Sequence, residues 1–239
     1  MLEIAKPSER VIVALDCDHD RALELADSLS GHAKWMKVGM TLFYACGPSV
    51  VSELKDRGYD VFLDLKLHDI PHQVRGAARS ASLTGADLLS VHSLGGAEMI
   101  AAAREGVEEA ARDRDERTKL VAITVLTSMD ADSLAQVGIE RNVSEEVSQL
   151  AAMAYDSGSD GVVCSPKEAS AMRLVLDDEA LVVTPGVRPA GSALGDQRRV
   201  ATPSDAVRSG ASHIVVGRPI TGASNPVAAF DAIAAELSS

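Results

Sequence analysis

The sequence has few cysteines and no excess of basic residues. Its three cysteines, Cys17, Cys46 and Cys164, are far apart and form no Cys-x-x-Cys pattern, so neither a disulfide framework nor a zinc site is expected. The formal net charge of -12 disfavours general binding to nucleic acid or to anionic membranes, because both require a basic surface. An anionic substrate would therefore need positive charge that is local to its site.

Long apolar runs are also absent. No run approaches the roughly 18 residues that span a bilayer, and the N-terminal segment MLEIAKPSER lacks the apolar stretch of a signal peptide. Together with the isolated cysteines, these absences predict a cytoplasmic protein without a membrane partner. Among the six histidines only His68 and His72 have the His-x-x-x-His spacing, with Pro71 between them, and no Glu-x-x-His pairing occurs, so no metal site is predicted.

Short apolar segments and amphipathic segments alternate along the 239 residues. The apolar segments are nearly continuous in Val, Ile and Leu, which is typical of strands that are buried on both faces. They begin at Val11, Trp35, Asp60, Asp87, Leu120, Gly161, Leu181 and His213. Most of the segments between them are rich in alanine, and Pro48 and Gly58 bracket one of them as helix start and stop signals.

This alternation predicts an α/β fold, a single (β/α)8 TIM barrel in which residues 1–239 form one domain. The alternative is an open doubly wound sheet. That fold usually carries a Gly-x-Gly-x-x-Gly motif after its first strand, but VIVALDCDHD contains no glycine.

Polar residues occur at the predicted carboxyl ends of the strands, where (β/α)8 barrels carry their chemistry. A single charge at such a place is often only a helix cap. A series over most strands points to one shared cavity. The series is Asp16, Lys37, Asp64, Lys66, His92, Thr127, Ser165, Arg188, Gly217 and Arg218.

The stretch DLKLHDIP, residues 64–71, places charges in an otherwise apolar segment. Because side chains alternate along a strand, Asp64 and Lys66 should share one face, toward the barrel axis. A buried ion pair adds little stability, so we favour a functional pair. Spacing leaves open whether Asp69 returns to Lys66 or reaches another group. Two carboxylates near Lys66 would keep it charged, which suits a proton donor and not a Schiff base.

The C-terminal third has the pattern of a phosphate site. Gly217 and Arg218 follow the last apolar segment, where a glycine admits a phosphate to the backbone and an arginine binds it in bidentate fashion. Such sites often follow strands seven and eight of a barrel. The preceding stretch VRPAGSALGDQRRVATP, residues 187–203, fits a lid over an anion and a solvated loop equally well.

Eight motifs, taken in order, resemble those of the bacterial type of orotidine 5'-monophosphate decarboxylase. They are VALD, KVG, FLDLKLHDIP, VLTSM, DGVVCS, VTPGVRP, GDQRR and GRPIT. They extend over nearly the whole chain, and the Asp-x-Lys-x-x-Asp-Ile-Pro element is highly specific. The resemblance implies a homodimer of barrels with shared active sites. It also implies conversion of orotidine monophosphate to UMP and CO2, the last step of de novo UMP biosynthesis, with no metal and no organic cofactor.

The resemblance also implies residue roles. Lys66 would protonate C6 as the carboxylate departs, and Asp64 would flank Lys66. Asp69, with Ile70 beside it, would act in the active site of the partner subunit. The remaining implied contacts are Asp16 and Lys37 with the ribose, Thr127 with the pyrimidine, and Arg188, Gln197, Gly217 and Arg218 with the phosphate.

One position departs from the family pattern. The family commonly has Asn-Thr after Asp-Ile-Pro, and its threonine contacts the ribose of the neighbouring site, whereas His72 and Gln73 follow here. Gln73 can still form a hydrogen bond, so we keep it among the expected substrate contacts.

Two alternatives remain open. The first is a phosphosugar enzyme on the same barrel, such as 3-keto-gulonate-phosphate decarboxylase or hexulose-phosphate synthase, which resembles the same element but requires Mg²⁺. The second is a catalytically silent nucleotide-binding barrel. The intact set of Asp64, Lys66 and Asp69 argues against the second, because binding alone does not need a lysine held between carboxylates.

Overall fold

Eight parallel strands form a closed barrel in the computed structural model, which describes residues 6–113, 116–189 and 201–237. The strands follow chain order around the ring, and β8 pairs with β1 to close it. They are β1 (Val11–Ala14), β2 (Trp35–Gly39), β3 (Asp60–Leu67), β4 (Leu88–His92), β5 (Lys119–Ile123), β6 (Gly161–Val163), β7 (Leu181–Thr184) and β8 (His213–Val216). The predicted (β/α)8 barrel is confirmed, and the open doubly wound sheet is excluded.

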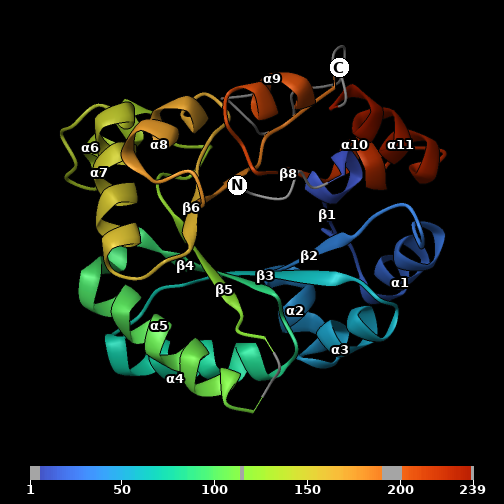
Figure 1. Ribbon diagram of the computed structural model, residues 1–239, viewed down its shortest axis with the longest axis horizontal. Helices are drawn as coiled ribbons and strands as arrows, with labels where there is room; N and C mark the ends of the chain where they lie inside the picture. Colours follow the sequence, from blue (N-terminus) through green and yellow to red (C-terminus); the bar gives the residue numbers. More distant parts are fainter. Residues whose placement is uncertain (1–5, 114–115, 190–200, 238–239) are drawn as a thin grey trace.

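Helices surround the strands (Figure 1). The α-helices are α1 (His19–Ser28), α2 (Met40–Cys46), α3 (Ser49–Asp56), α4 (Pro71–Leu83), α5 (Gly96–Ala111), α6 (Ala131–Gln136), α7 (Val143–Asp156), α8 (Ala169–Val175), α9 (Pro203–Arg208), α10 (Arg218–Thr221) and α11 (Pro226–Glu236). Two 3-10 helices are η1 (Pro7–Arg10) and η2 (Ser93–Gly95). Within the described ranges, no helix is both long enough and apolar enough to cross a bilayer.

Helix α4 follows β3 and precedes β4. It contains a glycine and two serines, which favour helix only weakly. Its partner is α5, beside it in Figure 1. The two helices approach so closely that a Cβ atom at Gly106 of α5 would lie 2.3 Å from the Arg75 carbonyl oxygen of α4. Tertiary packing therefore forms this helix where local propensity is weak.

The strands end earlier than the apolar pattern predicted. The fifth apolar segment continues to Thr127, but β5 ends at Ile123, and the seventh continues to Val187, but β7 ends at Thr184. The residues beyond the ladder are still apolar because they pack at the mouth of the barrel, where Val125 is 4% exposed. Polar residues that follow these segments consequently lie on loops and not on the strands.

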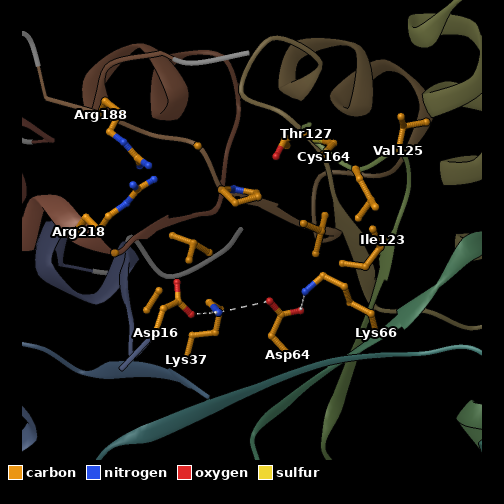
Figure 2. A pocket seen from close by; sticks show the side chains of 17 residues that line it. Asp16, Lys37, Asp64, Lys66, Ile123, Val125, Thr127, Cys164, Arg188 and Arg218 are labelled. Atoms are coloured by element: carbon orange, nitrogen blue, oxygen red, sulfur yellow. Dashed lines mark hydrogen bonds and ion pairs between the residues drawn. The ribbon is translucent and has the colours of Figure 1, made fainter. Parts of the chain in front are cut away.

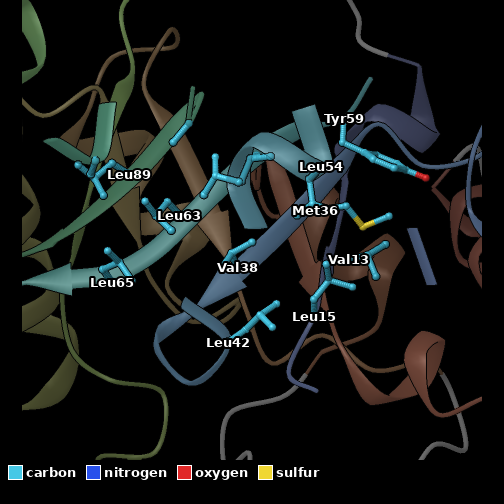
Figure 3. Packing of buried hydrophobic residues seen from close by; sticks show 14 of the residues in the cluster. Val13, Leu15, Met36, Val38, Leu42, Leu54, Tyr59, Leu63, Leu65 and Leu89 are labelled. Atoms are coloured by element: carbon cyan, nitrogen blue, oxygen red, sulfur yellow. The ribbon is translucent and has the colours of Figure 1, made fainter. Parts of the chain in front are cut away.

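Alternating side chains divide the core into two layers. Ile12 and Ala14 of β1 point into the barrel, where they meet Phe62 and other residues of the interior cluster. Val13 belongs to an outer layer between the strands and the helices. Figure 3 shows the part of this layer formed by Val13, Leu15, Met36, Val38, Leu42, Leu54, Tyr59, Leu63, Leu65 and Leu89. Each such fully buried aliphatic side chain contributes about 1.5–3 kcal/mol to folding.

Three polar residues brace the amino end of the barrel. Each directly precedes an even-numbered strand, and its side-chain oxygen accepts a backbone N–H from the strand before. The bonds are Val61 N–H to Asp87 Oδ2 at 2.7 Å, Leu120 N–H to Asp160 Oδ2 at 2.7 Å, and Val182 N–H to Ser212 Oγ at 2.9 Å. These side chains tie β3 to β4, β5 to β6 and β7 to β8.

Candidate active site

A cavity of about 610 Å³ opens at the carboxyl end of the strands. Strand ends and the loops after them supply its walls, as the series of polar residues predicted. Apolar walls include Ile123 and Val215. The charged lining residues are Asp16, Lys37, Asp64, Lys66, Arg188 and Arg218. Basic side chains outnumber acidic ones here, so the acidic protein has a local surplus of positive charge at this site.

Strand β3 is irregular where it meets the cavity. Its register with β4 moves from Leu63–Leu89 to Leu67–Val91, so residues 64–66 lie opposite a single residue of β4. Lys66 has a φ of 52°, and among the described residues it is the only non-glycine residue with a positive φ. This left-handed conformation costs about 1–3 kcal/mol. Both Asp64 and Lys66 line the cavity as alternation predicted, although the strand is irregular between them.

Four charged side chains form a chain across the cavity floor (Figure 2). Lys37 Nζ lies 3.2 Å from Asp16 Oδ1 and 3.5 Å from Asp64 Oδ2. The other oxygen, Asp64 Oδ1, lies 2.8 Å from Lys66 Nζ. The side chain of Asp64 is only 12% exposed, whereas that of Lys66 is 28% exposed and faces the open space. The charges alternate in sign, so each ammonium has a carboxylate beside it.

Asp64 is held in its ionised form. Burial raises the pKa of its carboxyl, but the ammoniums of Lys37 and Lys66 and the hydrogen bonds from Lys66 and Ser90 together lower it by more. The net pKa is below the ordinary aspartate value. At neutral pH the carboxylate can therefore fix the Lys66 ammonium in place.

The two arginines lie on the other side of the cavity from Asp64 and Lys66 (Figure 2). Arg188 follows β7, and its backbone N–H donates to the Ala201 carbonyl at 3.0 Å. Arg218 is the first residue of α10, directly after Gly217, and both line the cavity. Thr127, beyond β5, is a further lining residue. These positions agree with the predicted phosphate side of the site, although Gln197 lies outside the described residues.

Three predicted residues do not line the cavity of their own chain. Asp69, Ile70 and Gln73 are exposed at the start of α4. The carboxylate of Asp69 accepts the Ile70 N–H at 2.7 Å, so it does not return to Lys66. The question that spacing left open is thus answered for the single chain.

Two members of the strand-end series also lie outside the lining. His92 stacks on His68 with ring centroids 5.3 Å apart, and burial lowers the pKa of His92 to about 4, with smaller effects of His68 and Lys66. Ser165 is fully buried, and its Oγ accepts the Lys167 N–H at 3.2 Å. Both residues therefore have structural roles, and Cys164 packs in the wall of the cavity.

Sequence reasoning missed Ser90. This residue is the one opposite the irregular segment of β3, and its hydroxyl donates to Asp64 Oδ1 at 2.8 Å. The available signal was a serine inside the apolar run DLLSVHS, where a residue with a hydroxyl must find partners when buried.

Metal ligands are not gathered at the site. In the part of the chain that the structure describes, no group of three or more His, Cys, Asp or Glu side chains is placed to hold a metal ion. The two carboxylates of the cavity have the ammonium of Lys37 between them.

The fold and the site define a (β/α)8-barrel protein with a charged cavity at the carboxyl ends of its strands, lined by more basic than acidic side chains. A sequence profile described as "Orotidine 5'-phosphate decarboxylase / HUMPS family" matches residues 9–233. The chain therefore belongs to this family.

Individual relatives agree with the family match. A protein of Moorella thermoacetica named orotidine 5'-phosphate decarboxylase is 52% identical over 96% of this chain and 92% of its own length. A protein of Cutibacterium acnes with the same name is 51% identical over 94% of both chains. The crystal structure titled orotidine 5'-phosphate decarboxylase from Lactobacillus acidophilus has a TM-score of 0.87 and 40% identity, and covers 97% of this chain and 100% of its own.

Proposed function

We propose that this protein decarboxylates orotidine 5'-monophosphate to UMP and CO2, the last step of UMP biosynthesis. The observation that carries the proposal is the 2.8 Å pair of Lys66 Nζ and Asp64 Oδ1 in a cavity that also holds two arginines. Relatives about half identical over most of the chain are named for this reaction. The pair supplies a proton donor, and the arginines supply a phosphate anchor.

The reaction needs a cation at the reacting carbon. As the bond from C6 to the carboxylate breaks, its electron pair stays on C6 in the plane of the ring, where π delocalisation does not stabilise it. The enzyme must supply roughly 20 kcal/mol of transition-state stabilisation. We assign Lys66 as the group that stabilises this charge and transfers a proton from Nζ to C6, after which the neutral amine regains a proton from water.

Asp64 is assigned a place beside the leaving carboxylate. Its Oδ1 fixes Lys66 Nζ, and its Oδ2 lies 3.5 Å from Lys37 Nζ. We assign Lys37 and Asp16, which are 3.2 Å apart, to the ribose hydroxyls. The side chain of Asp16 is 67% exposed and can rotate to accept a hydrogen bond from a ribose hydroxyl. Thr127 is assigned to the pyrimidine.

The phosphate is assigned to the opposite side of the cavity. Arg188 and Arg218 supply two guanidinium groups, which can each bind phosphate oxygens in bidentate fashion. Gly217 supplies backbone, and Gln197 joins the set through the family resemblance alone. Binding energy at this distant group can position C6 against Lys66 and so raise turnover as well as affinity.

A homodimer with shared active sites is the proposed assembly. Several large hydrophobic side chains follow the carboxyl ends of β2, β3 and β4 and remain exposed in the single chain. They are Met40 (45%), Tyr44 (73%), Ile70 (62%) and Leu94 (45%). Asp69 belongs to the same region and does not contact its own Lys66. These features support an interface through which Asp69, Ile70 and Gln73 enter the site of the partner subunit.

Mixed dimers test this sharing. Lys66→Ala and Asp69→Ala chains, each inactive alone, are co-expressed with different tags, and the mixed dimer is purified. One of its two sites then has both Lys66 and Asp69, so about half of the wild-type activity per dimer is expected. Verified mixed dimers without activity would exclude a role of Asp69 in the partner's site.

The direct test of the activity is optical. Pure protein in excess EDTA is mixed with orotidine monophosphate, and the loss of orotate absorbance is followed. Full activity supports the proposal and excludes the Mg²⁺-dependent phosphosugar enzymes of the alternative. Tight binding without any loss of absorbance would instead identify a silent nucleotide-binding barrel.

Two broader assignments complete the proposal. We place the protein in the cytoplasm, which is supported by three cysteines that form no disulfide. We also treat residues 1–239 as one domain, supported by the pairing of β8 with β1 and by the packing of α11 against η1.

A further inference from the structure

Ser90 of β4 is buried beneath the cavity and has no substrate role in the proposal above. It is 0% exposed. Its hydroxyl donates to Asp64 Oδ1 at 2.8 Å, and its oxygen accepts the backbone N–H of Lys66 at 2.8 Å. One hydroxyl thus satisfies a carboxylate and a backbone donor of the neighbouring strand.

The contacts close into a ring that begins and ends on Lys66. The Lys66 N–H binds Ser90 Oγ, Ser90 Oγ–H binds Asp64 Oδ1, and Asp64 Oδ1 binds Lys66 Nζ at 2.8 Å. Both the backbone and the tip of the lysine side chain are therefore tied, directly or through one carboxylate, to the same oxygen of β4.

The ring lies where the sheet cannot hold the lysine by itself. Residues 64–66 of β3 face Ser90 alone, and Lys66 adopts a left-handed backbone. In a regular parallel ladder its N–H would bond to a carbonyl of the next strand, but here it bonds to a side chain. Bulges near active sites serve to re-aim a side chain, and a bulge needs a fixed anchor to hold one geometry.

We propose that Ser90 is a positioning residue for the reaction, whose hydroxyl fixes the bulge in β3 and thereby aims the Lys66 ammonium at the reacting carbon. This inference rests on the proposed decarboxylation. A hydroxyl suits the role because it donates one hydrogen bond and accepts others. Alanine has neither capacity, and threonine keeps both.

Three variants test the role. Ser90→Ala removes the hydroxyl, and Ser90→Thr keeps it. Ser159→Ala is the matched control, because Ser159 is 4% exposed and, in the described part of the chain, its Oγ has no hydrogen-bond partner. Folding is checked by circular dichroism, and kcat and KM are measured by orotate absorbance in EDTA, with Lys66→Ala as the blank.

A displaced general acid lowers turnover, since an error of about 1 Å in its position can reduce the rate on the order of 100-fold. The same displacement leaves ground-state binding of the substrate intact. We expect Ser90→Ala to lose about 10–100-fold in kcat with KM within about threefold. Ser90→Thr should stay within about threefold of wild type in both, and Ser159→Ala should match wild type. A folded Ser90→Ala with wild-type kcat, or equal losses in the alanine and threonine variants, would overturn the inference.

Two further measurements cover the remaining outcomes. If Ser90→Ala does not fold, Ser90→Cys, which keeps the size and a weak donor, should show an intermediate loss of kcat, and wild-type kcat would overturn the role. Crystal structures give a readout that does not depend on activity. The distance from Lys66 Nζ to Asp64 Oδ1, 2.8 Å here, should lengthen in the alanine or cysteine variant even if the wild-type protein proves inactive on orotidine monophosphate.

Discussion

At the amino end of the barrel, Asp160 accepts hydrogen bonds from the Arg117 guanidinium at 2.6 and 2.8 Å and from the Leu120 N–H at 2.7 Å. At the carboxyl end, Asp64 also lies beside basic groups, 2.8 Å from Lys66 Nζ, but there the ammonium faces an open cavity. Both sites join aspartate to a cation within one sheet. They differ in the surroundings of the cation. The Arg117 guanidinium binds Asp160 and the Thr118 carbonyl, whereas the Lys66 ammonium lines the cavity.

The backbone conformation also differs between the amino and carboxyl ends of the barrel. Asp87 and Asp160 strengthen the amino ends of the β3–β4 and β5–β6 ladders by binding an N–H of the neighbouring strand. Near Asp64 the ladder shifts register, and Lys66 takes a left-handed conformation. Charge at the amino end therefore stabilises the fold, whereas charge at the carboxyl end is accompanied by local strain, which is common at functional sites.

Lys66→Ala should produce the largest effect on activity. Removal of both the proton donor and the cation should lower kcat by at least about 10⁴-fold. Stability should change by less than about 1 kcal/mol, because the lysine side chain is partly exposed and Asp64 keeps Lys37 and Ser90 as partners. Absorbance assays and urea unfolding measure the two quantities. Near-normal turnover would exclude Lys66 from the mechanism. The ion pair at the carboxyl end of the barrel would then have no more functional importance than the one at the amino end.

Asp160→Asn should have the opposite profile. The change removes the charge that partners Arg117, whose side chain is 24% exposed, so the free energy of unfolding should fall by about 2–4 kcal/mol at pH 7. The kcat of the folded protein should stay within about twofold of wild type, since Asp160 is remote from the cavity. Urea unfolding and the absorbance assay again provide the measurements. Lost activity with unchanged stability would contradict the structural role of the amino end.

The pH dependence sharpens this second prediction. Burial raises the pKa of Asp160, but Arg117, the Leu120 N–H and Arg104 together lower it by more, so the folded value lies below the ordinary 3.8. The stabilisation by Asp160 is therefore fully present above the unfolded pKa and is lost as the pH falls through the folded one. The stability difference between wild type and Asp160→Asn should stay constant from about pH 7 to pH 5 and shrink below about pH 4. If the stability difference instead shrinks as the pH rises above 5, the Asp160 carboxylate is not its source.

The sequence predicted those features of the fold that depend on burial or on the alternation of side chains along a strand. Near-continuous apolar runs predicted eight strands and a barrel, and alternation placed Asp64 and Lys66 on one face. Such patterns reflect burial and pleating, which act on every residue of a strand. The residues of helix α4 favour a helix only weakly, and its contacts with α5 stabilise it.

Other features depend on which residues meet across strands, and this is not written in local spacing. The register shift between β3 and β4 and the position of Ser90 arise from the pairing of two strands about 25 residues apart. The proposed target of Asp69 lies in a partner subunit, so local spacing does not specify it either. The bracing residues Asp87, Asp160 and Ser212 had a signal, since each stands directly before an apolar run, but one polar residue at a strand start also fits a simple cap.

Arg218→Ala should have a smaller effect on activity than Lys66→Ala. Loss of one charged hydrogen-bonding group on the phosphate should reduce kcat/KM by about 10–100-fold. Stability should change little, because Arg218 lies at the start of the four-residue helix α10. The matched control is Arg208→Ala, since Arg208 pairs with Asp205 and its side chain is 65% exposed. Equal kinetics for the two variants would exclude Arg218 from the phosphate site.

Gln73→Ala should have the smallest effect at the carboxyl end. Gln73 is exposed in the single chain and can reach a substrate only across the proposed dimer interface. A single neutral hydrogen bond to the ribose is worth about 0.5–1.5 kcal/mol, so kcat/KM should fall by about 2–10-fold, with little change in kcat. Gln149→Ala on α7, which is exposed in the same way, serves as the control and should match wild type. If Gln73→Ala also matches wild type, the ribose contact that the family makes with threonine is absent here, and the cross-subunit contribution reduces to Asp69 and Ile70.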